Sequence, residues 1–440
     1  MSKNIEGLLH LSQPEFETGP KTPLGVGTRR AYHTLGTDVR AINVLTAPFL
    51  TPELRRIQDN LERQKEIHEH LQPAFDLLNQ NIVYMPKQAF LRASPFHCDN
   101  WVRDSFYGTL FIDEPDFEAH VLSQFDKADT SGHLPTTRLF PGTRTWAFDD
   151  ESTMLGLIWR AKLAQSGEPV EANEQSRWRQ RWEWVQSHTQ FGQYVSPAGT
   201  EHSWFDTYHF PRADVNTYTQ GIYAATTVAV TRLGLGNGSE IAEAVDGYQQ
   251  LQHSSGRLQF SRSQPYTDVS SLTGEFLAMA LFGEQLLSDS IVLETVYSLP
   301  KNSGGIPVVA TEDGGYLNPR EFNRQYLPGD YHNGGDWPLF NAFAHATAEK
   351  HGASHDRVFW QTLIEDLRRS NNAEYFYTGD GFIPESHNPT RTRTVWNTGV
   401  YKAASIVMSP QDIIQITCER DDDKGDLFYS EASQLPGSSL

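Results

Sequence analysis

The chain has 440 residues, with 36 Lys or Arg against 55 Asp or Glu, so its formal net charge at pH 7 is −19. An acidic chain has no basic excess with which to release counterions from phosphates, which argues against nucleic acid as a partner. Its 24 Phe, 17 Tyr and 10 Trp instead favour a neutral ligand with flat apolar faces and many hydroxyl groups, a description that fits sugars.

Cysteine content and the N-terminal segment bear on the compartment. Cys98 and Cys418 are the only two cysteines, which excludes a disulfide framework and the spacing of a zinc site. The first residues lack a basic stretch followed by an apolar run, so we predict no signal peptide. No stretch approaches 18 apolar residues, so we predict no membrane span. We therefore expect a cytoplasmic protein without a cofactor.

Histidine clusters could suggest a metal site, because the chain has 16 His. The local clusters are His68-Glu69-His70 and His332 near Asp330. Neither matches a catalytic zinc spacing such as His-Glu-x-x-His. Structural or surface roles are favoured over metal ligation, and we predict no metal.

Helical periodicity dominates the chain from Pro52 onward. The segment PELRRIQDNLERQKEIHEHLQPAFDLLNQ has apolar residues three or four positions apart and predicts one long helix. Further helices are predicted at 104–112, 116–127, 150–166, 173–189, 214–233, 239–252, 270–298 (long enough for two), 336–351, 355–370 and 394–408. Strand signals are short, at Ile82–Tyr84 and Ile306–Ala310. The predicted fold class is all-α.

Long loops rich in Gly, Pro, Asn, His and Trp separate these helices, and loops beyond about 12–15 residues usually have a function. Neither a solenoid repeat nor a Gly/Ser linker divides the chain. Helix pairs that alternate with long loops predict a toroid over 51–420, with the loops around a cavity at one end. Residues 1–50 are predicted to form a collar or loop segment, and 421–440 a flexible C-terminal tail.

Two segments place a carboxylate beside tryptophan. In Asn100-Trp101-Val102-Arg103-Asp104, adjacent Arg and Asp side chains can make charge-assisted hydrogen bonds with vicinal sugar hydroxyls. A salt bridge at a helix start is the structural alternative. In Ser203-Trp204-Phe205-Asp206-Thr207, an indole would desolvate Asp206, and a desolvated carboxyl is suited to donate a proton. A plain turn aspartate is the alternative there.

Two further segments lie later in the chain. Tyr331-His332-Asn333-Gly334-Gly335-Asp336-Trp337-Pro338 predicts a tight turn with positive φ, then a helix start with Asp336 as a cap. Its side chains suit either a polyol site or the turn itself. Phe382-Ile383-Pro384-Glu385 places an isolated carboxylate in a loop before the last predicted helix, near Val395-Trp396-Asn397. A surface glutamate is the alternative for Glu385.

The order of these four segments resembles that of the catalytic (α/α)6-barrel domain of inverting glycoside hydrolases, across about residues 85–408. The resemblance is to the amylo-α-1,6-glucosidase domain of glycogen-debranching enzymes and to family 63 glucosidases with their glucosylglycerate hydrolase relatives. Glucoamylases and neutral invertases are more distantly similar. The resemblance implies Asp206 as the general acid and Glu385 as the general base. It implies sugar binding by Trp101, Arg103, Asp104, Asp149, Asp150, Trp204, Tyr331, His332, Asn333, Gly334, Trp337 and Trp396.

Three features bear on these assignments. Pro384 stands where the family usually has a small residue before the base. The larger members carry a β-sandwich domain before the barrel, for which this chain has no room, and this argues against a large polymer such as glycogen. The string Trp146-Ala147-Phe148-Asp149-Asp150-Glu151 keeps a second candidate for the acid open, because Asp149 or Asp150 could act instead of Asp206. Three acids also suit a helix N-terminus without any function.

The sequence therefore predicts an inverting, exo-acting hydrolase that releases terminal glucose from an α-glucoside. The substrate would be a disaccharide, a short oligosaccharide or a glucosylated metabolite, with no nucleic-acid or membrane partner; the oligomeric state stays open. One alternative is an inverting disaccharide phosphorylase, with Arg391 and Arg393 beside the phosphate. Others are a sugar epimerase, with His332 and His387, and a non-catalytic sugar-binding barrel.

Overall fold

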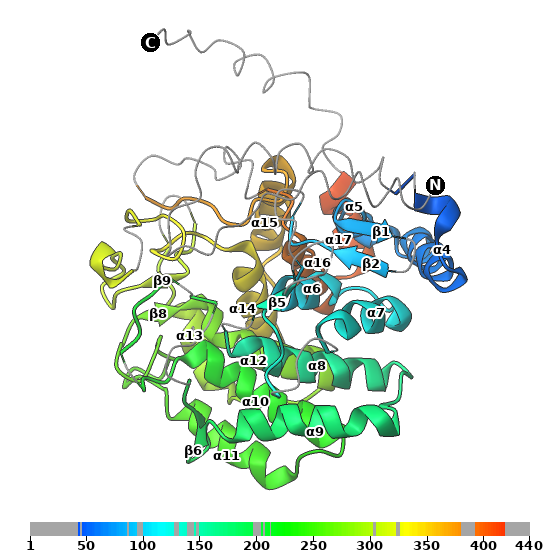
Figure 1. Ribbon diagram of the computed structural model, residues 1–440. Coiled ribbons are helices and arrows are strands. Elements are labelled where there is room, and N and C mark those ends of the chain that lie inside the picture. The colour runs from blue at the N-terminus through cyan, green and yellow to red at the C-terminus, as the bar shows by residue number, and fades with distance from the viewer. Residues whose placement is uncertain are drawn as a thin grey trace, which may run out of the picture.

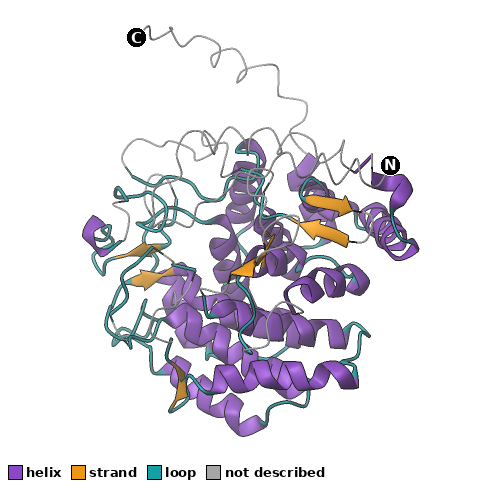
Figure 2. Ribbon diagram, in the orientation of Figure 1, coloured by secondary structure: helices purple, strands orange, loops and turns teal. Residues whose placement is uncertain are grey.

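The computed structural model describes residues 43–44, 46–85, 88–94, 100–126, 132–138, 145–146, 149–196, 204–205, 207–211, 213–301, 305–322, 326–379 and 392–418. Helices make up most of the secondary structure in these ranges, and the strands are short (Figures 1 and 2). The predicted all-α class is confirmed. Within the same ranges, no helix has both the length and the apolar character that a membrane span requires.

The first predicted helix is divided into two. Helix α4 (Pro52–Ile67) begins after Thr51, whose hydroxyl accepts a hydrogen bond from the Leu54 amide (3.3 Å). The helix ends at His68, and a 3₁₀ turn η2 (Glu69–Leu71) leads into α5 (Gln72–Asn79). A single helix over 52–80 is therefore wrong. The physical reason is Pro73, which has no amide hydrogen and whose ring would clash with the preceding turn of a continuous helix.

Strands occupy connections between the helices. The described ranges contain these antiparallel pairings: β1 (Ile82–Met85) with β2 (Gln88–Leu91), β3 (Asn100–Trp101) with β4 (Thr137–Arg138), β4 with β5 (Thr145–Trp146), β6 (Thr189–Gln190) with β7 (Gln193–Tyr194), and β8 (Thr267–Asp268) with β9 (Val309–Ala310). Ile82 lies opposite Leu91, and Thr267 lies opposite Ala310. The first predicted strand is confirmed, whereas only the last two residues of the second are strand.

Six helices of the described chain pack in a closed ring, in which each contacts the next and the last contacts the first. They are α6 (Val102–Thr109), α8 (Glu151–Gln165), α10 (Thr217–Arg232), α12 (Thr273–Leu277), α14 (Pro338–Lys350) and α16 (Thr398–Val407). Helices α8 and α10 are buried along most of their length, as expected for helices surrounded by other elements. Helices α10 and α12 approach closely where a Cβ on Gly274 would overlap the carbonyl of Gly221.

Other helices cover the ring from outside: α7 (Pro115–Asp126), α9 (Ala172–Gln186), α11 (Gly238–Gln249), α13 (Asp289–Tyr297), α15 (Arg357–Arg369) and α17 (Pro410–Cys418). Helix α15 buries Trp360, Leu363, Ile364 and Leu367, the three-and-four spacing of an amphipathic helix. The predicted helical region 270–298 contains two parts, because a π-helical turn after α12 ends at Gly283 with φ of 71° before α13 begins. Helix α17 was not predicted.

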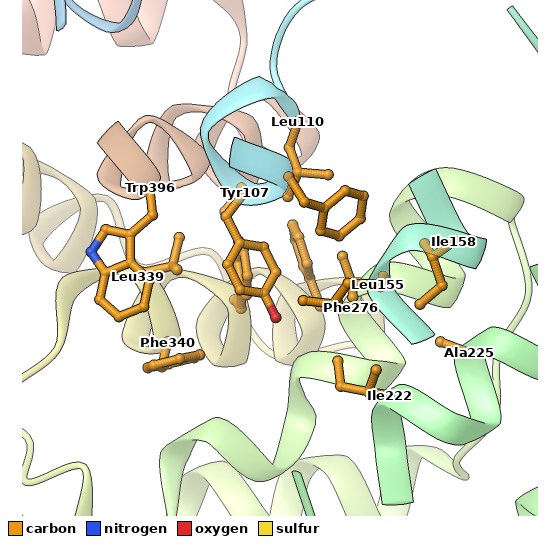
Figure 3. Packing of buried hydrophobic residues seen from close by; sticks show 14 of the residues in the cluster. Tyr107, Leu110, Leu155, Ile158, Ile222, Ala225, Phe276, Leu339, Phe340 and Trp396 are labelled. Atoms are coloured by element: carbon orange, nitrogen blue, oxygen red, sulfur yellow. The ribbon is translucent and has the colours of Figure 1, made fainter. Parts of the chain in front are cut away.

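Side chains from the ring helices fill its centre. Figure 3 shows Tyr107 of α6 among Leu155 of α8, Ile222 of α10, Phe276 of α12 and Phe340 of α14. All five side chains are buried. The middle of the ring is therefore a packed core, and the residues available to a ligand are those at the ends of its helices.

Candidate functional site

Several of the predicted site residues, together with Glu151, which was not among them, lie at the N-terminal ends of the ring helices. Arg103 and Asp104 are in the first turn of α6, and Glu151 is the first residue of α8. Trp337 precedes α14, and Trp396 lies in the 3₁₀ turn η8 (Val395–Asn397) before α16. Helix N-termini carry partial positive charge, which stabilises carboxylates placed there. The sequences of these helix starts therefore account for the gathering of acids at one end of the ring.

Arg103 joins three of these helix starts. Its Nη1 donates to Oε1 of Glu151 (2.6 Å), and its guanidinium carbon lies 5.7 Å from the centre of the Trp396 ring. The Glu151 carboxyl is completely buried, and the Arg103 side chain is 13% exposed. An arginine held between a carboxylate and an indole is fixed in direction by both partners.

Burial controls the protonation of the carboxyls near Arg103. It raises the pKa of Glu151 to about 7, although the attraction of Arg103 opposes the rise. It also raises the pKa of Asp104 to about 6, again against Arg103. The negative charge of Asp149 adds to both shifts. Near neutral pH the site therefore offers carboxyl groups that can donate as well as accept hydrogen bonds.

Asp149 and Asp150, the alternative candidates for the acid, are both buried in front of α8. Oδ1 of Asp149 accepts a hydrogen bond from the Ser152 amide (3.0 Å), which is the bond of a helix-capping residue. Its own amide donates to the Thr136 hydroxyl (3.1 Å). The structural role considered for these acids is thus present at Asp149.

Two tyrosines that sequence reasoning did not select connect the ring helices here. The hydroxyls of Tyr107 on α6 and Tyr218 on α10 lie 2.8 Å apart. Burial raises the pKa of both phenols, so both keep their protons. Glu151, likewise not selected alone, contributes to the pKa shift of Tyr218. Their signal in the sequence was weak, because a tyrosine or glutamate in the first turns of a helix is common.

An aromatic cluster joins the second, third and fourth sequence segments. The Trp204 ring centre lies 4.8 Å from His332 and 4.7 Å from Trp337. Tyr331 stacks on His332 (4.0 Å), and Trp337 lies 5.4 Å from Trp396. Trp204, His332, Trp337 and Trp396 are all buried, whereas Tyr331 is half-buried. The structure thus brings these residues together, although they come from segments up to 192 positions apart in number.

The turn around Asn333 has the expected tight geometry with one difference. Gly334 has a positive φ of 91°, as predicted for this turn. The other residue of the turn with a positive φ is Tyr331 (45°), which is not a glycine. The buried Asn333 amide donates to the Tyr326 carbonyl (3.1 Å). Asp336 does not cap α14 as predicted: its carboxylate accepts hydrogen bonds from the Asn341 amide (2.5 Å) and the Ile306 backbone (3.1 Å). This carboxylate therefore ties the turn to the chain before β9.

The two predicted catalytic residues, Asp206 and Glu385, lie outside the described residues, and so do His387 and Arg391. The neighbours of Asp206 are described. The Phe205 ring lies 5.0 Å from His332, and the Thr207 hydroxyl is 2.7 Å from Nδ1 of His332. Before the Glu385 segment, the Thr378 hydroxyl donates to the Gly334 carbonyl (2.6 Å).

The remaining predicted residue, Trp101, is half-buried in β3 immediately before α6. Among the buried polar atoms of the described chain, Nε of Arg103 and Nε1 of Trp396 have no hydrogen-bond partner. Other buried atoms of the described chain, among them Nη1 of Arg181, Nε1 of Trp182 and the Tyr194 hydroxyl, also lack a partner, so this feature is not specific to the cluster. In the described ranges, no group of three or more His, Cys, Asp and Glu residues could hold a metal ion.

No protein-family model and no curated protein matches this chain. Solved structures do match it. An uncharacterized conserved protein from Thermus thermophilus has a TM-score of 0.54 at 12% identity, covering 76% of this chain and 100% of its own. A mannosylglycerate hydrolase of glycoside hydrolase family 63 from the same organism, in complex with glucose, has a TM-score of 0.53 at 12% identity, covering 76% and 99%.

A third structure, a wild-type glycosidase, has a TM-score of 0.51 at 14% identity and covers 79% of this chain and 98% of its own. At these identities the likeness concerns the fold. This chain therefore has the fold of glycosidases that include a family 63 hydrolase, as the order of its four sequence segments predicted.

Proposed function

We propose that this protein is an inverting, exo-acting glycoside hydrolase that releases terminal glucose from a small α-glucoside. One observation carries the proposal: segments 101–104, 149–151, 204–205, 331–337 and 395–397 meet at the N-terminal ends of the ring helices. They do so in a fold shared with glycosidases. In this proposal, the ring and its outer helices form the (α/α)6 barrel predicted over 51–420.

Asp206 would be the general acid and Glu385 the general base. An inverting mechanism needs the two carboxyls roughly 6.5–9.5 Å apart, so that the base can activate a water on the ring face opposite the acid. Two contacts support the pairing, because Thr207 binds His332 and Thr378 binds the carbonyl of Gly334. The residue after Asp206 and a residue seven positions before Glu385 are thus attached to the same Tyr-His-Asn-Gly turn.

Asp149 is the less favoured acid, because a local role already occupies its carboxylate. Its Oδ1 accepts the Ser152 amide. A hydrogen bond with a backbone amide in the first turn of a helix is a structural role that needs no catalytic function. This supports Asp206 over Asp149.

Arg103 and Asp104 would bind the hydroxyls of the terminal sugar, with Trp101, Trp337 and Trp396 as walls. The Arg103 guanidinium supports this role, because it is held between Glu151 and Trp396 on a side chain that is 13% exposed and can donate to a sugar oxygen. One structural neighbour is a mannosylglycerate hydrolase. Glycosylglycerates therefore join disaccharides and short oligosaccharides as candidate substrates.

Product analysis of the purified protein tests the proposal. The protein is incubated with glucosylglycerate, mannosylglycerate, maltose, isomaltose and trehalose, and ¹H NMR follows the anomer that appears first. We expect β-glucose from a cleaved α-glucoside, and losses on the order of 10²-fold or more in Asp206→Asn and Glu385→Gln. Asp246→Asn, an exposed change on α11, is the matched control.

Each alternative outcome identifies a different reaction. Initial release of the α-anomer alone would contradict inversion; with trehalose, an inverting enzyme releases one β-glucose and one α-glucose, because the leaving glucose keeps its α configuration. Full activity in either carboxyl variant would refute that residue's role. A requirement for phosphate would identify a phosphorylase, and a product of unchanged mass would identify an epimerase.

A further inference from the structure

A buried carboxyl outside the predicted site, that of Asp268, is connected to Trp204 by two hydrogen bonds through Ser270. Asp268, the last residue of β8, is 1% exposed. Its Oδ1 accepts hydrogen bonds from both the backbone amide (2.8 Å) and the hydroxyl (2.6 Å) of Ser270. The Ser270 oxygen in turn accepts a hydrogen bond from Nε1 of Trp204 (3.0 Å). All three side chains are buried.

The chemistry of the three groups sets the direction of this chain of hydrogen bonds. An indole N–H can only donate, so the Ser270 oxygen must be its acceptor. The hydroxyl has a single proton, which it donates to Asp268. With that proton committed, the serine offers a lone pair to the indole and is held against rotation. Asp268 thus controls the orientation of Trp204 through Ser270.

Trp204 in turn packs in the aromatic cluster, two positions before the candidate acid in the sequence. Its ring contacts His332 and Trp337 at the centre of the cluster. The ring of the next residue, Phe205, also lies 5.0 Å from His332, so a rotated indole would disturb the packing of both residues against His332. On the other side of Asp206, Thr207 is hydrogen-bonded to His332.

We propose that Asp268 and Ser270 are positioning residues for the reaction, which orient the indole of Trp204 and thereby its contacts with His332 and Trp337. The inference rests on the proposed glycosidase function. Neither residue is assigned a contact with the substrate. Their effect is on geometry, and a displacement of about 1 Å at a reacting group can lower the rate by on the order of 10²-fold.

Steady-state kinetics of four variants test this role on a substrate that the wild-type enzyme cleaves. Ser270→Ala and Asp268→Ala should lower kcat by about 10- to 100-fold with KM changed less than about threefold, because Arg103 and Asp104 keep their places. Asp268→Asn should restore kcat to within about threefold, since its amide oxygen can still accept both Ser270 bonds.

Ser271→Ala is the matched control. Ser271 is buried in the same 3₁₀ turn as Ser270, η3 (Val269–Leu272). Its hydroxyl donates to the backbone carbonyl of Asp268 (2.6 Å) and takes no part in the hydrogen bonds that connect Asp268 to Trp204. It should keep wild-type kcat. Thermal unfolding of every variant separates a kinetic effect from a loss of folded protein.

The indole resonances of ¹⁵N-tryptophan-labelled protein supply a readout that does not depend on turnover. The indole resonance of Trp204 is assigned with Trp204→Phe. Its chemical shift should change in Ser270→Ala and Asp268→Ala and should remain that of the wild-type protein in Ser271→Ala. An active wild-type enzyme with unchanged kcat in Ser270→Ala would overturn the positioning role alone. A wild-type protein that cleaves none of the glycosides would overturn both this role and the proposed function.

Discussion

Replacing Asp268 by asparagine should flatten the pH dependence of the protein's thermal stability between pH 5 and 8. Burial raises the pKa of Asp268 from its ordinary 3.8 to about 7, although the Ser270 hydrogen bonds oppose the rise. Between these two values the folded protein holds a proton that the unfolded chain has released. Stability must therefore fall as pH rises from about 4 to about 7, and the loss must level off above pH 7.

The size of the effect follows from the two pKa values. Each unit of difference corresponds to about 1.4 kcal/mol, so a shift of about three units is worth roughly 4 kcal/mol in total. About 3 kcal/mol of this falls between pH 5 and 8. At about 2 cal/mol/K of unfolding entropy per residue, a chain of this length loses roughly 1 °C in Tm per kcal/mol. The difference in Tm between Asp268→Asn and the wild-type protein should therefore grow by about 3 °C from pH 5 to pH 8.

Asparagine is a suitable replacement because of how the carboxyl is bound. Oδ1 of Asp268 accepts both Ser270 bonds, whereas Oδ2 has no hydrogen-bond partner in the described part of the chain. In asparagine, the amide oxygen can replace Oδ1 and accept both Ser270 bonds, and the NH₂ group can replace Oδ2. The protonated acid likewise places a donor at one oxygen, so the variant imitates the low-pH form of the wild-type protein.

Thermal scans at pH 5, 6, 7 and 8, at one ionic strength and one heating rate, measure the difference in apparent Tm. A fixed heating rate matters because a chain of this size often unfolds irreversibly. Asp246→Asn, exposed on α11, should show a difference from wild type that stays constant with pH. A constant difference for Asp268→Asn as well would refute the assignment of a neutral, buried acid at this position.

Two further changes test the site and the ring. Arg103→Met leaves the buried Glu151 carboxylate without its counter-charge. The free energy of unfolding should fall by about 3–5 kcal/mol at pH 9. It should fall by less at pH 6, because the Glu151 carboxyl of the wild-type protein is protonated there. Equal losses at both pH values would contradict this reasoning. Gly274→Ala would place a methyl group on the Gly221 backbone and should lower stability by at least about 2 kcal/mol or prevent folding, whereas Gly238→Ala, with open space around it, should keep the wild-type Tm.

The sequence predicted helices well where local patterns determine them. The helix predicted over 214–233 is α10 (Thr217–Arg232), and its start is set by Asn216, whose side chain accepts a hydrogen bond from the Thr219 amide. The prediction failed at His68, where periodicity continues through a proline that the backbone cannot accommodate in a helix. Periodicity reports side-chain spacing, and it misses a break that depends on the backbone alone.

The site was predicted in pieces, because its assembly depends on contacts between distant positions. Glu151 was visible only as one of three acids at a helix start, and its partner Arg103 lies 48 positions away. Asp268 had no visible motif. Its acceptance of the Ser270 amide is an ordinary local capping bond, and its connection to Trp204 spans a 66-residue separation that only the closed ring creates.

The contacts of Arg103 differ from its structural alternative, and its role in sugar binding stays a proposal. The structural alternative was a salt bridge with the neighbouring helix carboxylate, whereas Arg103 pairs with Glu151, 48 positions away. Arg181 binds Asp126 through both Nε and Nη2, and its buried Nη1 has no hydrogen-bond partner in the described ranges. Arg103 binds Glu151 through Nη1, and its buried Nε has no partner in the described ranges. Each salt bridge orients its guanidinium, so a buried nitrogen without a partner does not by itself distinguish a sugar-binding arginine from a structural one.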